Sequence, residues 1–206
     1  MARNFFVMAL AVSIVLLAAG ASAQVNDVSA GLGRTFISDQ GVQGTNLIDS
    51  NIHFGDGFSY SLSYGRRLVD IGIASLTVEV PFVHDPTVGL NYGNNVVPKD
   101  FSAFYLTPSV RVNAFPHFAV SPWISGGGGF APFSPSSHLE YGGASAGKSS
   151  TTGAIQLGAG LDVTLIGPIK LRGELRDFYT GEPDFNLKPQ KHMHNLFAGA
   201  GLVLNF

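Results

Sequence analysis

The chain has 206 residues, of which 13% are charged and 26 are glycine. The charged share is about half the usual share of about 25%, and glycine is nearly twice as frequent as average. The 12 Lys and Arg residues against 14 Asp and Glu provide no basic excess for binding nucleic acid. The absence of cysteine excludes disulfide bonds, thiolate metal sites, cysteine nucleophiles and a lipoprotein anchor.

The first 23 residues have the pattern of a secretory signal peptide. Arg3 supplies a positive charge, residues 5–19 are uncharged and apolar, and Ala21-Ser22-Ala23 is a small-residue cleavage site. The apolar run is shorter than the roughly 20 residues of a transmembrane helix. We therefore expect a signal peptide over 1–23 and a mature barrel domain over 24–206. Because no long apolar run follows residue 23, a membrane role for the mature chain would have to use strands.

The mature chain contains eight segments in which apolar residues alternate with small or polar ones, the pattern of strands with two different faces. The segments cover residues 27–36, 58–68, 73–83, 103–113, 118–130, 152–165, 169–179 and 194–206. The second segment is the clearest: Phe58, Tyr60, Leu62 and Tyr64 alternate with serines. In the fifth segment, Trp123 fits either face.

The connections between these segments alternate between short and long. Short turns lie around Asp70, at Phe115-Pro116-His117 and at Ile166-Gly167-Pro168, whereas polar loops span residues 37–57, 84–100, 131–151 and 180–191. Short periplasmic turns, long external loops and an even strand number are typical of outer-membrane barrels. Segments of about 9–11 residues suffice to cross a bilayer when tilted. The sequence predicts an all-β fold, an eight-stranded antiparallel up-and-down transmembrane β-barrel.

On these features the chain resembles the small eight-stranded outer-membrane barrels of the OmpA/OmpX type, over about Val25 to Phe206. The signal peptide, the alternation, the charged face of LRGELRDF (residues 171–178) and the terminal Phe206 carry the resemblance. It implies a monomer in a Gram-negative-type outer membrane, in contact with outer-membrane lipids. It also implies that Phe206 is the signal read by the outer-membrane insertion machinery. The sequence has no peptidoglycan-binding segment after Phe206, so a cell-wall tether is not implied.

Seven charged residues fall on the polar face of the predicted strands: Glu79, Arg111, Asp162, Lys170, Arg172, Glu174 and Arg176. Side chains fill the interior of an eight-stranded barrel, and buried charges must pair and hydrogen-bond. We therefore predict that these residues form a network that plugs the lumen, with a charge-lined pore as the alternative. We expect Arg66 on the outer face near the periplasmic end, where it would meet lipid headgroups.

Most aromatic residues fall near strand ends or on the outer face, as in the two girdles of an outer-membrane barrel. They are Phe58, Tyr60, Tyr64, Phe82, Phe104, Phe118, Phe130 and Tyr179. Only Tyr105, Phe197 and Trp123 are candidates for the lumen face. We expect the run Gly126–Gly129 to thin a strand near a barrel rim, and Gly199 and Gly201 to leave space for charged side chains of the seventh segment.

The histidines do not predict a metal site. His192 and His194 share a strand face, but zinc needs three or four ligands, and we expect no metal and no cofactor. His84-Asp85 and Ser137-His138 with Glu140 contain the residue types of a hydrolase, whose triads are defined by geometry rather than by sequence. We expect a non-enzymatic protein with an envelope-structural or adhesion role, with surface ligands bound through external loops. A narrow pore for small solutes and a lipid-modifying enzyme are the alternatives.

Overall fold

The computed structural model describes residues 25–38, 40–41, 51–55, 57–91, 98–139, 142–144, 148–181 and 192–206. The expected signal peptide over 1–23 and Glu140 lie outside these residues. Within the described ranges, no helix is long and apolar enough to span a membrane.

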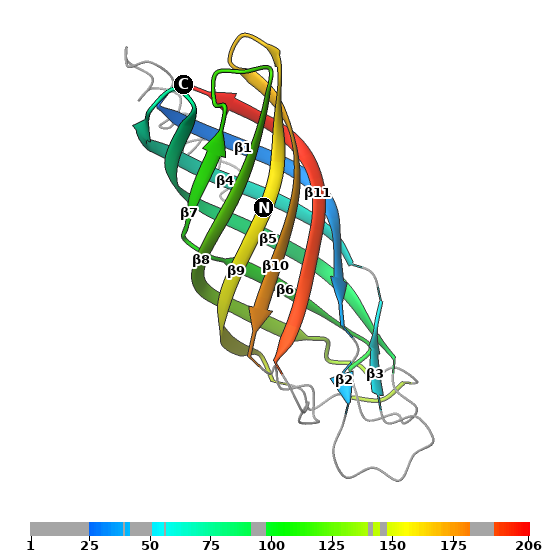
Figure 1. Ribbon diagram of the computed structural model, residues 1–206. Helices are drawn as coiled ribbons and strands as arrows, with labels where there is room; N and C mark the ends of the chain where they lie inside the picture. The colour runs from blue at the N-terminus through cyan, green and yellow to red at the C-terminus, as the bar shows by residue number, and fades with distance from the viewer. Residues whose placement is uncertain are drawn as a thin grey trace, which may run out of the picture.

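The described residues form one antiparallel sheet that closes on itself (Figure 1). β1 pairs with β4 on one side and with β11 on the other, so the first and last strands form the seam of a barrel. The strands, in chain order, are β1 (Asn26–Ile37), β2 (Gln40–Gly41), β3 (Asn51–Phe54), β4 (Gly57–Asp70), β5 (Ala74–Asn91), β6 (Asp100–Leu106), β7 (Ser109–Ala114), β8 (Val120–Pro135), β9 (Ser150–Ile166), β10 (Ile169–Thr180) and β11 (Met193–Asn205).

Eight strand positions make up the barrel wall. β6 and β7 both lie between β5 and β8 and share one position. They are two parts of one wall strand that is interrupted at Thr107-Pro108. β2 and β3 form a small extension that pairs with the far end of β5. The predicted eight-stranded antiparallel barrel is therefore confirmed, as is the pairing of the last strand with the first, in which Ala30 lies opposite Leu202.

The two ends of the barrel differ in the length of their connections. The short turns β4–β5, β7–β8 and β9–β10 lie at one end, at the top of Figure 1, and β2, β3 and the strand ends that border the long connections lie at the other. We call them the short-turn end and the long-loop end. Phe206 lies at the short-turn end, where its N–H donates to the carbonyl of Asn26 over 2.9 Å.

Two strands continue further toward the long-loop end than the sequence analysis predicted. β5 runs to Asn91 and β8 to Pro135, so the loops expected over 84–100 and 131–151 are shorter than predicted. In β5 a register shift between Asp85 and Val88 interrupts the alternation, and Val88 and Leu90 then return to the interior. The strand was expected to end at Val83 because residues 84–100 were assigned to a polar loop.

The outer face of the barrel is apolar and the inner face is mixed. Phe58, Tyr60, Leu62 and Tyr64 each expose 41–52% of their surface, whereas Ser59 between them is fully buried. The Trp123 side chain faces inward and is 2% exposed, which settles its face. An apolar outer surface of this extent is a mark of contact with lipid or another protein.

The run Gly126–Gly129 lies in the middle of β8 and not near a rim, which corrects the prediction. It faces the interruption between β6 and β7, and a Cβ atom at Gly127 or Gly129 would collide with the carbonyl oxygen of Pro108 or Leu106. These glycines therefore permit the close backbone approach at which the wall passes from β6 to β7.

Candidate functional site

The lumen near the short-turn end is filled by paired charges, and Glu79 is at the centre of them. Glu79 is fully buried on β5 and accepts a hydrogen bond from Nη1 of Arg111 to Oε2 over 2.8 Å. The second amino group of Arg111 donates to Asp27 on β1. Arg111 thus links three strands, because β7 carries the arginine and β1 and β5 carry its two carboxylates.

A second arginine crosses the lumen to the same carboxylate. Nη1 of Arg176 donates to Oε1 of Glu79 over 2.8 Å, and its Nε donates to Glu174 over 2.8 Å. β5 and β10 are four positions apart in the ring of eight, so the Glu79–Arg176 pair joins opposite walls. This pair therefore spans the lumen of the barrel at its level.

The third arginine is held by two parallel hydrogen bonds and an aromatic ring. Nε and Nη2 of Arg172 donate to Asp162 over 2.7 and 2.8 Å. The indole N–H of Trp123 also donates to Asp162, over 3.2 Å. The guanidinium carbons of Arg172, Arg176 and Arg111 lie 5.2, 5.0 and 5.9 Å from the Trp123 ring centre, within the range of cation–π attraction.

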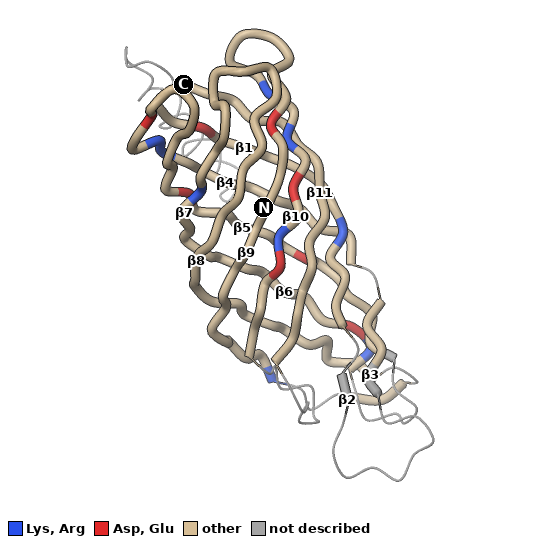
Figure 2. The backbone as a smooth tube through the Cα atoms, in the orientation of Figure 1, with Lys and Arg blue, Asp and Glu red and all other residues tan. Residues whose placement is uncertain are grey.

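The charges of this region balance. Its cationic side chains are Arg111, Lys170, Arg172 and Arg176, and its carboxylates are Asp27, Glu79, Asp162 and Glu174, four of each. We call these eight residues and Trp123 the ionic half of the lumen. Figure 2 shows charged residues along the barrel wall, in strands that are otherwise largely uncharged. The structure thus places all seven sequence-predicted lumen residues in one region.

The lumen toward the long-loop end is filled by aromatic rings. Tyr105 on β6 stacks on Phe178 of β10, with ring centres 4.5 Å apart and planes 18° from parallel. Phe133 packs edge-on against Tyr105 at 6.2 Å and lies 6.0 Å from Phe101. Phe101, Tyr105, Phe133, Phe178 and Phe197 are each at most 1% exposed, and we call these five the aromatic half.

A few polar groups accompany the aromatic half. The hydroxyl of Thr35 donates to Asp85 over 2.8 Å and lies 2.8 Å from the Ser59 hydroxyl. Gln156 connects the two halves: it accepts from Ser109 over 2.6 Å and donates to Ser125 over 3.1 Å. Hydrogen-bonded side chains therefore lie between the ionic half and the aromatic half.

The residues considered for catalysis do not assemble into a triad within the described part of the chain. His84 lies on the outer side of β5, where its ring contacts the Ala103 carbonyl over 3.1 Å, whereas its neighbour Asp85 is buried inside. Ser137 and His138 lie 3.2 Å apart on the surface, and Glu140 is outside the described residues. No group of three or more His, Asp or Glu side chains in the described ranges could hold a metal ion.

Several lumen residues were not predicted from the sequence. Asp27 was placed at the start of a strand but not in the network, although it is in phase with the inward-facing Ser29. Phe101, Phe133 and Phe178 were not recognised as lumen aromatics, so the expectation of only three candidates was wrong. Gly199 and Gly201 lie opposite the charged Glu174 and Arg172 of β10, but a Cβ atom at Gly199 would first meet the ring of Phe197 and one at Gly201 the β1 backbone.

Solved structures of outer-membrane barrels are similar to this chain along most of its length. Neisserial surface protein A covers 90% of this chain and 100% of its own, with 17% identity and a TM-score of 0.56. OprG of Pseudomonas aeruginosa covers 90% and 98%, with 10% identity and a TM-score of 0.57. The outer membrane protein AlkL covers 91% and 93%, with 13% identity and a TM-score of 0.55. No family model and no curated protein matches the sequence.

Proposed function

Because the chain has the fold of the small eight-stranded outer-membrane barrels, we propose that it is a non-enzymatic outer-membrane protein with a plugged lumen. Its role would be envelope-structural or adhesive and would be exerted through its outer surface and its long-loop end. The Glu79–Arg176 pair carries this proposal, since it joins opposite walls of the barrel over 2.8 Å. Two further observations support it: the aromatic half lies on the long-loop side of this pair, and the charges of the ionic half, to which the pair belongs, are balanced.

A plug is favoured over a pore because several of its charged side chains have more than one hydrogen-bond partner. Glu79 accepts from two arginines and Asp162 accepts from Arg172 and Trp123. A conducting path would require these buried pairs to separate inside the barrel, which leaves charges without partners. The lumen is therefore expected to stay closed to ions.

Conductance in planar bilayers tests this proposal directly. Refolded mature protein should insert without producing ion-conducting steps, and it should migrate faster on gels when it is not boiled. A matched variant, Glu79→Ala with Phe178→Ala, removes the central carboxylate and one stacked ring and should conduct if it still folds. Regular conductance steps from the unmodified protein would overturn the plug in favour of the narrow pore.

Phe206 would be the insertion signal. Its position at the seam, where it exchanges backbone hydrogen bonds with Asn26, supports a part in closing the barrel. Deleting Phe206 should leave export to the periplasm unchanged and reduce the amount of heat-modifiable protein in outer-membrane fractions. Normal assembly of the shortened chain would show that the signal lies elsewhere.

A further inference from the structure

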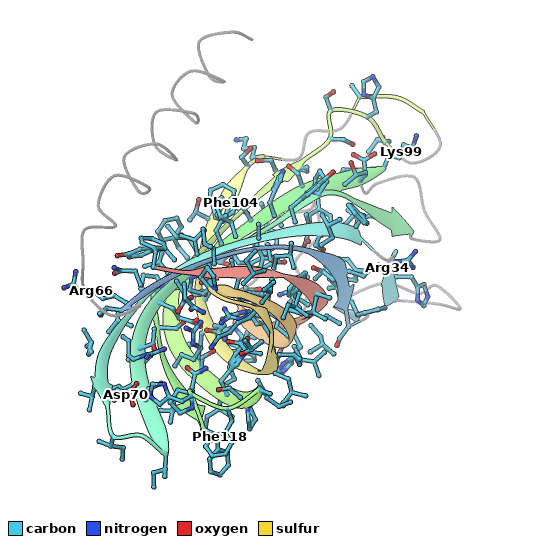
Figure 3. The ribbon with its side chains drawn as sticks, turned by 90° about the horizontal axis from the view of Figure 1, so that it is seen from above. Arg34, Arg66, Asp70, Lys99, Phe104 and Phe118 are labelled. Atoms are coloured by element: carbon cyan, nitrogen blue, oxygen red, sulfur yellow. The ribbon has the colours of Figure 1, made fainter. Side chains whose placement is uncertain are left out.

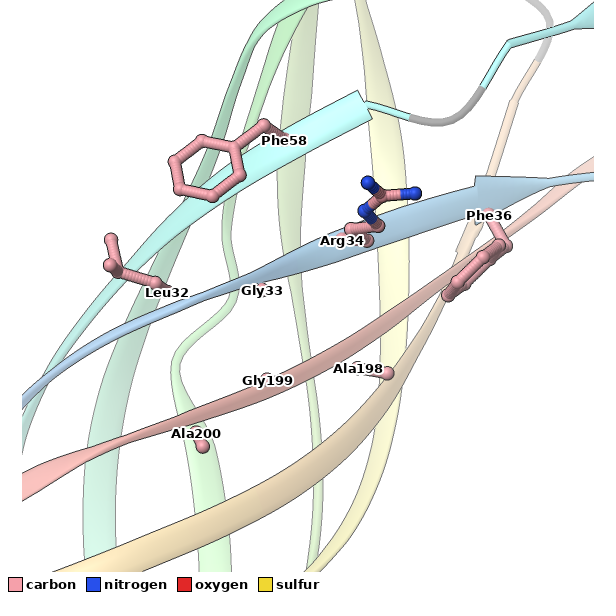
Figure 4. Close-up of a pocket in the computed structure, with 8 residues that line it drawn as sticks. All are labelled: Leu32, Gly33, Arg34, Phe36, Phe58, Ala198, Gly199 and Ala200. Carbon is pink, nitrogen blue, oxygen red and sulfur yellow. The ribbon is translucent and has the colours of Figure 1, made fainter.

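A shallow hollow of about 530 Å³ lies on the outer face of the barrel, over the seam between β1 and β11 (Figure 4). Its floor is low because Ala198 and Ala200 point outward where other positions of the outer face carry larger side chains. Apolar side chains flank it, with Leu32, Phe36 and Phe58 each 43–53% exposed. We call it the seam groove; its lining is Leu32, Gly33, Arg34, Phe36, Phe58, Ala198, Gly199 and Ala200.

One charged side chain, Arg34, belongs to the seam groove. Arg34 is exposed on the outer face of β1 and lies opposite Phe58 of β4 and Ala198 of β11. It is near the long-loop end, because β1 ends three residues later at Ile37. Its counterpart Arg66 lies opposite Asn26 at the short-turn end, and Figure 3 shows the two arginines far apart.

The depth of Arg34 suits an anionic headgroup. An arginine on the lipid face costs about 2–4 kcal/mol at the middle of the bilayer and about 0–1 kcal/mol near the interfaces. Arg34 lies level with the aromatic residues Phe36 and Phe58, and such aromatic girdles mark the interface. A guanidinium at this level can bind phosphate oxygens through two parallel hydrogen bonds.

We propose that the seam groove binds one molecule of lipid A from the outer leaflet. An acyl chain lies over Ala198 and Ala200, and Arg34 binds a phosphate of the glucosamine headgroup. The proposal rests on the outer-membrane placement above, in which the long-loop end faces outward and meets the leaflet that carries phosphorylated glycolipid. The positive charge of Arg34 beside an apolar hollow complements a lipid with phosphate next to its acyl chains.

Native mass spectrometry of the refolded mature chain in neutral detergent tests the proposal. Titration with bis-phosphorylated lipid A should give a one-to-one complex. Arg34→Gln should weaken it about tenfold, as expected for loss of a charge-assisted hydrogen bond. Ala198→Leu, which fills the groove without changing charge, should weaken it several-fold. The matched control Arg66→Gln should bind as the unmodified protein does, and every variant should show the gel shift of a folded barrel.

Two comparison lipids decide the identity of the occupant. Lipid A without phosphates should bind the unmodified protein as weakly as bis-phosphorylated lipid A binds the Arg34→Gln variant. Phosphatidylglycerol bound as tightly as lipid A would overturn lipid A as the occupant, and unchanged affinity in both groove variants would overturn the site. If the protein binds no lipid A but produces no conductance in planar bilayers, the lipid A site is overturned and the plugged barrel is still supported.

Discussion

The two halves of the lumen are filled by different kinds of contact. In the ionic half, Glu79, Arg111 and Arg176 are at most 2% exposed and depend on one another for hydrogen bonds. In the aromatic half, Tyr105 and Phe178 fill the lumen by stacking on each other. The ionic half needs matched partners at fixed distances, whereas the aromatic half needs only volume and shape.

This difference predicts how each half responds to a substitution. A buried ion pair adds little net stability when it is intact, but removing one partner leaves an uncompensated charge. Removing a ring from the aromatic half leaves a cavity, whose free-energy cost depends on how far the neighbours relax. The ionic half should therefore tolerate single substitutions less well than the aromatic half.

The largest effect should follow Glu79→Gln. The substitution keeps the size of the side chain and removes the charge shared by Arg111 and Arg176. We expect the free energy of unfolding to fall by about 3–5 kcal/mol, the range for breaking a buried ion pair. Urea unfolding of the barrel in lipid vesicles, followed by the shift between folded and unfolded bands on gels, measures it.

Asp177→Asn is the control for that substitution. Asp177 also pairs with a basic group, His194, over 2.8 Å, but His194 is on the surface and 57% exposed. The control should change the free energy of unfolding by less than about 1 kcal/mol, as exposed pairs do. Equal losses in the two variants would contradict the special cost of an unpaired charge in the ionic half.

Phe133→Ala should have the next largest effect. The ring is fully buried and packs against Phe101 and Tyr105, so its removal leaves a cavity in the aromatic half. A loss of about 3 kcal/mol is expected, at the lower end for such truncations, in the same urea experiment. Phe118→Ala is the control, because Phe118 is 63% exposed outside the lumen. A loss below that of the control would show that the rings do not pack as a core.

The sequence predicted the barrel well because its signals are periodic. Inward and outward residues alternate along every strand, so Glu79, Arg111 and Arg176 could be assigned to the lumen from phase alone. The alternation of short turns and long loops likewise predicted which end each strand begins at. These signals need no knowledge of distances.

The partners of each charge were not predictable in the same way. The Glu79–Arg176 pair joins residues 97 positions apart on opposite walls, and a choice among four carboxylates depends on barrel tilt and side-chain reach. Phe133 was missed because the strand was expected to end at Phe130, with the run Gly126–Gly129 near its end rather than at its middle. The seam groove was missed because it depends on β1 and β11 meeting in one particular register.

An exposed charge cluster around Asp70 lies at the short-turn end, outside the lumen. Asp70 is the last residue of β4. It accepts a hydrogen bond from the Gly72 N–H over 2.9 Å, and Arg67 and His117 contact it over 2.9 and 3.0 Å. The Gly72 hydrogen bond and the two basic groups hold the pKa of Asp70 below its ordinary value of 3.8, although some burial opposes them. Because this pKa is lowered in the folded state, its stabilisation is present above pH 3.8 and is lost as pH falls through the folded value.

Asp70→Asn should therefore flatten the acid end of the stability curve. Above pH 5 the variant should be less stable than the unmodified protein by less than about 1 kcal/mol, because the site is exposed. The difference should disappear at low pH, where Asp70 is protonated in both states. Unfolding by urea at a series of pH values measures it, and a difference that grows as pH falls would reverse the assigned sign.

The smallest expected quantity is the coupling between the two halves. Glu79 and Phe133 are far apart: Phe133 lies opposite Ala103, which lies opposite Asp85. Asp85 is six residues along β5 from Glu79, or roughly 20 Å at the rise of a strand. Losses at sites so far apart add to within about 0.5 kcal/mol. The double variant Glu79→Gln with Phe133→Ala should thus lose the sum of the two single losses. A coupling above about 1 kcal/mol would mean that Gln156 and Ser125, which lie between the halves, transmit strain, and that the lumen is one plug rather than two.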